Sequence, residues 1–472
     1  MISPIATFSG GRVLMRMPFT PILSLLTFSV SVADGVPWWN ESLSHRVPVR
    51  VVAAKETEKD FPVQVTLDFG ALAGGKAFDP ASVRVVEVDP ATGSFLRVAP
   101  SVFLPSEASQ GTPVRSGWVP PYLPHAAPTA RASSESPQMP VGNVTDTWIL
   151  FKPTLWEPSA PLPPWIVSLD FGKPVWINSL WTHYPGHPST QHCPLRAEFQ
   201  VATQSADGVS DGAWEKVGDW DRDNTRISGQ YRAVWFAPRK VQCARLVIHE
   251  SSGVPWIDDF RALAPVHDPE KSGVGSVNWI AEGATTNDKP RLFFVYFRTK
   301  DAKGVPPPPA VARVGIIREG EASVYSLHGI GFGSGPLTDA DASGTDKANI
   351  LSCPKWTMSH AALIACFPVT LPANGKWCLH LRVRGNLKEH PITVFLDNHP
   401  FFNGTFTTEG SDWTIISLPP RDIPLGVHYL EMYLVDTQNQ QLDLDYALLT
   451  NDEKFLPRSY LRVESGNVEV KP

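Results

Sequence analysis

The chain has 472 residues and a formal net charge of −6 at pH 7, and 42% of its residues are hydrophobic. A chain of this length is typical of about three domains, and the apolar content excludes an intrinsically disordered protein. The acidic balance argues against nucleic-acid binding, which normally needs a basic face. The 16 Trp, 23 Phe, 46 Pro and 34 Gly residues favour a loop-rich, all-β protein over a helical one.

Residues 1–33 have the pattern of an export signal. Arg12 and Arg16 give a positively charged start, an apolar run covers residues 22–32, and the S-V-A motif at residues 31–33 has the small-x-small form of a cleavage site. The apolar run is about 11 residues long, whereas a membrane span needs roughly 20. We therefore predict a cleaved signal peptide, no membrane span, and a secreted protein that is extracellular or periplasmic.

Residues 34–127 contain short runs with the two-residue alternation of β-strands. VPVRVVA, FPVQVTLDF and ASVRVVEV are rich in β-branched residues and are separated by Gly, Asp and Pro turns. Sustained helical periodicity is absent almost everywhere, so we expect an all-β fold made of several β-sandwiches. Pro, Ser, Ala and Gly crowd residues 108–140, which predicts a linker there.

The middle block, residues 128–264, carries four sequence elements in order. They are SSESPQMPVGNVTD, PPWIVSLDFGKPVWINSLWTHYP, RAEFQVATQSADG followed by AWEKVGDW, and ARLVIHESSGVPWIDDF. These elements resemble the discoidin family, also called the coagulation-factor type C (F5/8 type C) module, which has a galactose-binding-like fold. The resemblance implies a jelly-roll β-sandwich whose ligand site lies on the loops at one end.

A sugar presents an apolar ring face and a set of hydroxyls, so a sugar site combines an aromatic plane with a few fixed donors and acceptors. In the sugar-binding branch of the family, a His, an Arg, an Asn and a late aromatic residue form the site. Three loops supply these types here: WTHYPGHPSTQH, DWDRDNTRISGQYR and ESSGVPWIDD. Ordinary solvated or core residues are the alternative, and Trp181 is expected to be a core residue. The resemblance implies a ligand site made of His183, Tyr184, Arg222, Asn224, Arg226 and Trp256.

Two metal hypotheses follow for the same block. Discoidin-like modules often carry a structural calcium near the first loop, and Asp146 and Asp259 resemble the acidic positions there, where hard oxygen ligands suit the ion. Ordinary turn carboxylates are the alternative. His183, His187 and His192, with a Cys beside the last, could instead bind zinc or copper, although prolines leave this loop no helical face to align them. We expect no other cofactor.

The two flanks of the middle block look like pieces of one sandwich. WWNESLSHRVPVRVVAAKETEKDFPVQVTLDF resembles an N-terminal module of large secreted bacterial proteins, which a later segment of the type W-x-x-x-G…R-x-x-x-V-Y-F completes. Here that segment lies at residues 279–297. We predict that the middle block is inserted between residues 34–127 and residues 265–302 of this first sandwich, with pairing between residues 47–69 and 291–297. Residues 34–127 alone would leave an unpaired strand edge.

The rest of the chain resembles a second carbohydrate-binding module. Residues 303–320 contain four consecutive prolines, which predicts a semi-rigid linker. Residues 321–458 carry KWCLHLRVRG, ITVFLDN, WTIISL, LGVHYLEMYLV and LDLDYALLTND, and these resemble galactose-binding-like jelly rolls. Residues 459–472 look like a short strand or a loose tail. Cys366 and Cys378 lie on neighbouring expected strands and are either bridged or ordinary buried thiols.

The chain contains no G-x-S-x-G elbow, H-E-x-x-H, P-loop or dinucleotide motif. The leading hypothesis is a secreted, non-catalytic carbohydrate-binding protein that holds a glycan or polysaccharide at loop-end sites of the discoidin-like and C-terminal modules. The first alternative is a polysaccharide lyase or glycoside hydrolase with accessory binding modules, because such sites assemble from distant strands. The second is an adhesion or scaffold protein with a protein partner. At this point it is open whether any domain is an enzyme.

Overall fold

The protein is built almost entirely from antiparallel β-strands, which confirms the predicted all-β, multi-sandwich fold. Helix is limited, within the described residues, to α1 (Phe69–Leu72) and the one-turn 3-10 helices η1 (Pro80–Ser82) and η3 (Val141–Thr145). None of these helices is long and apolar enough to cross a membrane. The expected signal peptide lies outside the described residues. The structure, a computed structural model, describes residues 36–105, 128–145, 155–184, 192–205, 207–221, 231–264, 273–302, 313–319, 335–338, 349–353, 362–385, 390–397, 399–406, 408, 412–434 and 442–471.

Two antiparallel sheets form the first sandwich. The larger sheet has the order β25-β1-β13-β3-β4, with β26 also paired to β1, and the smaller has the order β2-β12-β5. Alternate side chains of each strand face the space between the sheets, so Val47, Val49 and Val51 of β1 share a core with Trp279 of β12. The strands are β1 (His45–Ala53), β2 (Glu58–Asp68), β3 (Arg84–Val88), β4 (Phe95–Ala99), β5 (Ser101–Pro105), β12 (Val274–Thr285), β13 (Arg291–Phe297), β25 (Leu461–Ser465) and β26 (Glu469–Val470).

Three separate segments of the chain contribute strands to the first sandwich. β1 pairs with β13, with Val47 opposite Val295, and β2 pairs with β12, with Val63 opposite Trp279. The pairing that an inserted middle block requires is therefore present. Residues 459–472, expected as a short strand or a loose tail, supply β25 and β26, which both pair with β1. The first sandwich consequently encloses both other sandwiches between its strands along the chain.

The middle sandwich is a six-stranded sheet with the order β11-β7-β10-β8-β9, in which β6 also pairs with β7. β7 and β10 are 19 and 21 residues long, and their pairing shifts register between Trp235 and Arg239 and again between Val241 and Cys243. Such irregularities bend strands, so the sheet can close over its own core. The strands are β6 (Thr129–Ala132), β7 (Trp165–His183), β8 (Pro194–Ala202), β9 (Glu215–Trp220), β10 (Tyr231–Ser251) and β11 (Asp259–Leu263).

The C-terminal sandwich has one sheet of order β15-β16-β24-β18-β21, joined by β14 and β22, and a second of order β17-β23-β19-β20. β14 begins at Gly315, so a strand occupies some of the expected linker 303–320. The strands are β14 (Gly315–Glu319), β15 (Gly335–Thr338), β16 (Asn349–Cys353), β17 (Ala362–Leu371), β18 (Gly375–Gly385), β19 (His390–Leu396), β20 (His399–Phe406), β21 (Thr414–Ser417), β22 (Arg421–Ile423), β23 (Gly426–Leu434) and β24 (Leu442–Thr450).

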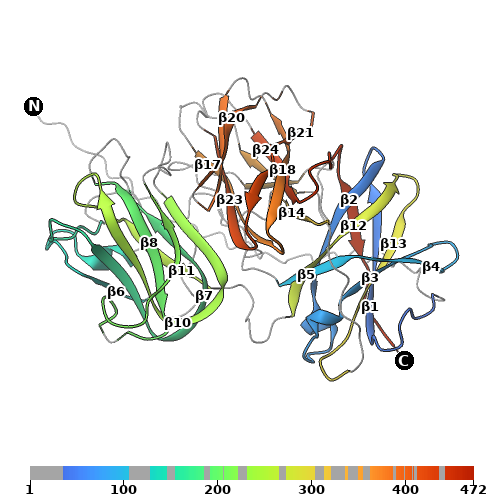
Figure 1. Ribbon diagram of the computed structural model, residues 1–472, viewed down its shortest axis with the longest axis horizontal. Coiled ribbons are helices and arrows are strands. Elements are labelled where there is room, and N and C mark those ends of the chain that lie inside the picture. Colours follow the sequence, from blue (N-terminus) through green and yellow to red (C-terminus); the bar gives the residue numbers. More distant parts are fainter. Residues whose placement is uncertain are drawn as a thin grey trace, which may run out of the picture.

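The C-terminal sandwich lies between the other two (Figure 1). On one side, β24 and the connection to β25 contribute Tyr446, Leu448 and Phe455 to the core of the first sandwich. On the other side, buried apolar residues of the middle and C-terminal sandwiches form a single cluster, which confirms that Trp181 is a core residue. The cluster contains Trp181, Ala233, Trp235, Cys366, Phe395 and Tyr429.

Among the described residues, four cysteines are buried thiols outside any disulfide: Cys193, Cys243, Cys366 and Cys378. A bridge between Cys366 and Cys378, one of the two possibilities left by the sequence, is therefore absent, and the buried-thiol alternative is confirmed. Burial raises the pKa of the Cys193 and Cys243 thiols to about 11. Because the thiolate is the reactive form, these two groups are poor nucleophiles at neutral pH.

Candidate functional site

Two residues of the expected ligand site lie inside the middle sandwich rather than on its surface. His183 is the last residue of β7 and is fully buried; its Nδ1 lies 2.6 Å from Oδ2 of Asp258, which is buried too, and its carbonyl accepts the Asp258 backbone N–H. Tyr184 packs in the core and stacks with Trp220 at a centroid distance of 6.4 Å. Both side chains hold the end of β7 in place, so neither offers a surface to a sugar.

The expected calcium ligand Asp259 is also buried, at the start of β11. Its two carboxylate oxygens accept hydrogen bonds from the guanidinium of Arg261, with Nε 2.7 Å from Oδ1 and an Nη nitrogen bonded to Oδ2. A buried carboxylate balanced in this way has its charge already neutralised, which competes with its use as a calcium ligand. Asp146 lies outside the described residues, and the calcium site stays a prediction.

Several of the other expected residues lie outside the described part of the chain. Arg222, Asn224 and Arg226 lie outside the described residues, as does His187 of the three-histidine hypothesis. Within the portion of the chain that the structure describes, no group of three or more His, Cys, Asp or Glu side chains is arranged to hold a metal ion. Of the six expected ligand residues, Trp256 is therefore the one described residue that keeps some of its side chain at the surface.

Trp256 forms a stacked aromatic pair with His192. The two rings are parallel to within 6°, and their centroids are 3.7 Å apart. Both side chains are half-buried. The backbone N–H of Trp256 donates to the carbonyl of His192 over 3.1 Å, and Nδ1 of His192 lies 2.6 Å from the carbonyl oxygen of Val254. The pair is thus held both by ring contact and by two hydrogen bonds that join its loops.

His192 has a backbone conformation that few non-glycine residues adopt. Its φ is 76°, in the left-handed region, where a side chain costs energy unless the surroundings compensate. The next residue ties the turn down: the carbonyl of Cys193 accepts the Ser252 N–H over 3.0 Å and the Ser251 hydroxyl over 2.9 Å. The fold therefore maintains a strained turn at the point where the imidazole meets the indole, a placement typical of functional sites.

The hydrogen bond to Val254 also determines what His192 can offer a ligand. A carbonyl oxygen only accepts, so Nδ1 must carry the proton. In the neutral ring, Nε2 then has a lone pair and can accept a hydrogen bond, for example from a sugar hydroxyl. The imidazole is therefore both one layer of an aromatic stack and a potential acceptor.

Glu157 completes the group and was not expected from the sequence. One carboxylate oxygen, Oε2, accepts the indole N–H of Trp256. Glu157 is positioned by its neighbour Trp156, a fully buried anchor that exchanges two backbone hydrogen bonds with Ile257, of 2.7 and 3.1 Å. The rim platform, defined as His192, Trp256 and Glu157, thus joins three distant regions of the middle sandwich. No local motif marks Glu157, because its contact partner lies about a hundred residues away.

The C-terminal sandwich, where a loop-end glycan site was also expected, uses the aromatic and histidine side chains described next for its own structure. Trp377 is fully buried in the core. His428 has Nδ1 bonded to Asp397 and Nε2 2.8 Å from the Pro424 carbonyl oxygen. The half-buried Trp413 lies 4.6 Å and 4.5 Å from the guanidinium carbons of Arg382 and Arg384, which occupy its ring faces. Phe401 is a core residue.

Comparison with known proteins gives structural likeness alone. No family model and no curated protein sequence matches the chain. A family 32 carbohydrate-binding module from C. perfringens NanJ, solved with galactose, is 20% identical over 28% of this chain and 91% of the module, with a TM-score of 0.23. Chitosan-binding module 2 of a chitosanase/glucanase from Paenibacillus sp. IK-5, solved with chitotriose, is 14% identical over 29% of this chain and 97% of the module, with a TM-score of 0.24.

A third similar structure is the lectin domain of lectinolysin complexed with Lewis B antigen. It is 10% identical over 34% of this chain and 96% of that domain, with a TM-score of 0.24. All three identities and TM-scores are too low to transfer a function to this chain. The case for a function therefore rests on the geometry of the rim platform.

Proposed function

We propose that this protein binds glycans at the rim platform of the middle sandwich and does so as a secreted, non-catalytic binding protein. The observation that carries the proposal is the parallel His192–Trp256 stack, held at the surface by a turn with a left-handed residue. A surface aromatic pair fixed by hydrogen bonds is a rigid plane, and the C–H face of a sugar ring packs on such a plane.

Polar groups at the edge of the platform match the hydroxyls of a sugar that lies on it. The lone pair on Nε2 of His192 accepts from one hydroxyl, and the carboxylate of Glu157 accepts from another while it holds the Trp256 indole. Because these groups are fixed before the ligand arrives, little side-chain entropy is lost on binding. The platform therefore combines an apolar contact with directional acceptors, the combination that a sugar site needs.

A binding role fits the platform better than catalysis does. Glycoside hydrolysis needs two carboxyl groups on opposite sides of the scissile bond. Here the one carboxylate of the platform bonds the indole, and the imidazole has one nitrogen committed to a carbonyl. These commitments support a preorganised surface. A polysaccharide-processing enzyme remains the rival hypothesis, and a screen for polysaccharide cleavage would test it.

The test is a glycan array with residues 34–472, run with calcium and with a chelator, on the natural chain and on Trp256→Ala. Loss of the stacking plane should weaken binding at least about tenfold, since truncating an aromatic residue that dominates a binding site costs about 2 kcal/mol or more. Trp214→Ala is the matched control, because Trp214 is a half-exposed indole of the same sandwich that packs on Arg245 with a 4.0 Å centroid distance. Binding that survives Trp256→Ala, or falls equally in both variants, would contradict the proposal.

A further inference from the structure

The charge of the rim platform suggests which glycans it prefers. Oε2 of Glu157 bonds the Trp256 indole, whereas Oε1 accepts no hydrogen bond from the described residues. Glu157 also forms no ion pair in the described portion of the chain and is half-exposed. An aromatic plane with an uncompensated carboxylate at its edge attracts cations and repels anions. The whole chain is acidic as well, which adds a weaker field of the same sign.

We propose that Glu157 makes the platform charge-selective, so that it binds glycans with a protonated amine more tightly than their neutral N-acetylated forms and rejects carboxylated glycans. This inference rests on the proposed function and specifies its ligand class. A sugar amine that reaches Oε1 forms a charge-assisted hydrogen bond, which is stronger than a bond between neutral groups. A uronic acid in the same place would put two carboxylates together, and each would disfavour the other's charge.

The decisive variant is Glu157→Gln. Its side-chain carbonyl can still accept the indole N–H, so the stack with His192 keeps its support while the negative charge is removed. Glu56→Gln is the matched control: Glu56 is exposed in the turn between β1 and β2 of the first sandwich, and this substitution changes the net charge by the same amount. Equal melting temperatures of the three proteins would show that any difference in binding is not a folding defect.

The probes are a glucosamine tetramer, its N-acetylated counterpart and an oligogalacturonate of equal length, measured by calorimetry at one mildly acidic pH. The natural chain should prefer the free amine about fivefold, as expected for a partly exposed charge pair of roughly 1 kcal/mol. Glu157→Gln should abolish that preference and admit the oligogalacturonate, and Glu56→Gln should change neither.

The outcomes separate the two proposals. If the natural chain binds the neutral tetramer without preferring the amine, or if Glu157→Gln keeps the preference, Glu157 is not the selecting group and the inference is overturned. If the natural chain binds none of the probes and no glycan of the array, the proposed function itself falls. High salt should weaken the amine preference, because screening reduces charge–charge attraction but leaves stacking intact.

Discussion

The first and middle sandwiches are both all-β, yet the chain builds them in different ways. The middle sandwich uses one continuous stretch from β6 to β11, and its core, within the described residues, contains its own side chains. The first sandwich gathers strands from three segments and shares its core with Tyr446, Leu448 and Phe455 of the C-terminal block. A continuous unit can fold and be removed by itself, whereas a shared core cannot be divided without exposing apolar surface.

The sharpest test of this comparison removes residues 459–472. The deletion takes away β25 and β26 and the buried side chains of Tyr460, Leu461 and Val463 from the core of the first sandwich. Each lost large side chain costs about 2–5 kcal/mol, against a typical total stability of roughly 5–15 kcal/mol. We expect the first sandwich to unfold, which circular dichroism melting and limited proteolysis would detect.

The second test of the comparison removes the middle sandwich: residues 128–264 are replaced by a short Gly-Ser linker. Pairing of β1 with β13 and of β2 with β12 involves no residue of the middle block, so the first and C-terminal sandwiches should remain folded. Exposure of Phe395 and Tyr429 at the lost seam should lower solubility rather than abolish folding. A folded protein after the tail deletion, together with an unfolded one after excision, would reverse the comparison.

A smaller effect concerns Glu58, which holds the connection that leads into β25. Its buried carboxylate accepts the backbone N–H groups of Arg458 and Ser459. Burial raises the pKa of Glu58 from 4.5 to about 7. The folded state therefore binds the proton more tightly than the unfolded state, and the stabilisation is fully present below about pH 4.5 and is lost as the pH rises through about 7.

Urea unfolding measured from about pH 5 to about pH 8 should show this loss, on the order of 3 kcal/mol at most, in the natural chain. Glu58→Gln keeps an acceptor without a titratable charge, so its profile should be flatter. Glu56→Gln, two residues earlier and exposed, removes only the smallest contribution to the raised pKa of Glu58 and should follow the natural chain closely. Parallel profiles for all three proteins would show that Glu58 does not govern the pH dependence.

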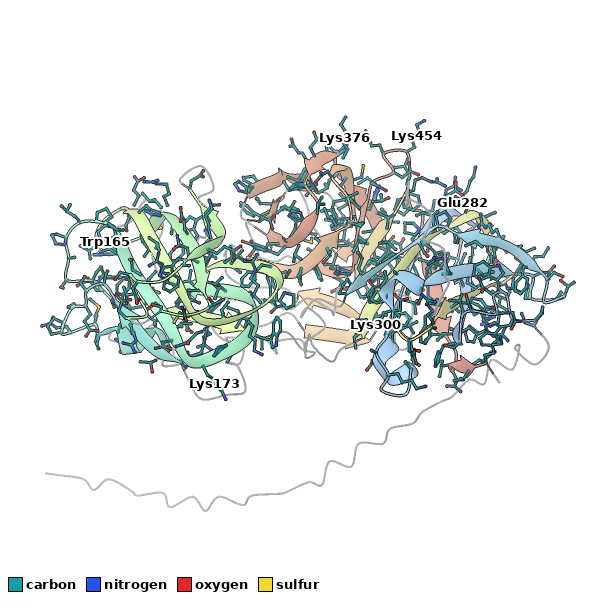
Figure 2. All side chains as sticks on the ribbon, turned by 60° about the horizontal axis from the view of Figure 1, so that its bottom comes forward. Trp165, Lys173, Glu282, Lys300, Lys376 and Lys454 are labelled. Atoms are coloured by element: carbon teal, nitrogen blue, oxygen red, sulfur yellow. The ribbon has the colours of Figure 1, made fainter. Side chains whose placement is uncertain are left out.

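The smallest effect is expected for a chain of ion pairs between the first and C-terminal sandwiches. Arg313 lies 3.2 Å from Asp452 and 3.4 Å from Glu282, and Glu282 lies 2.7 Å from Arg97. Figure 2 labels Glu282, which belongs to the first sandwich, and Lys454, which follows β24 of the C-terminal sandwich. Because these groups are partly exposed, Glu282→Gln should cost less than about 1 kcal/mol. The cost should vanish at high salt, and an equal loss at low and high salt would mean that packing is responsible.

The strands and several of their pairings could be predicted from the sequence because they depend on local pattern. Alternating β-branched runs give β1 and β2, and the aromatic run at 291–297 gives β13, which indeed pairs with β1. The last strands, β25 and β26, were harder to predict. β25 is short, and what makes it a strand is its partner β1 at the other end of the chain, which no local window contains.

The site was predicted less completely, for two physical reasons. His183 and His192 occur in one loop motif, but His183 is in a strand covered on both faces, so alternation does not show which histidine faces outward. His192 becomes accessible through a left-handed turn whose hydrogen bonds come from residues 251–254. The position of Glu157 beside Trp256 depends on the long-range hydrogen bonds between Trp156 and Ile257. Trp256, in a turn rich in Ser, Gly and Pro, was the residue that sequence pattern could place.

The position of β25 and β26 has a consequence for the timing of folding. β1 is made before β25 and β26, the strands that cover its edge, and most of the described chain lies between them in the sequence. Until β25 and β26 have been made, this edge of β1 is open and can pair with another chain. Contacts so far apart in sequence also form slowly. Production of this protein should therefore improve at low temperature and low expression rate, where fewer unfinished chains meet one another.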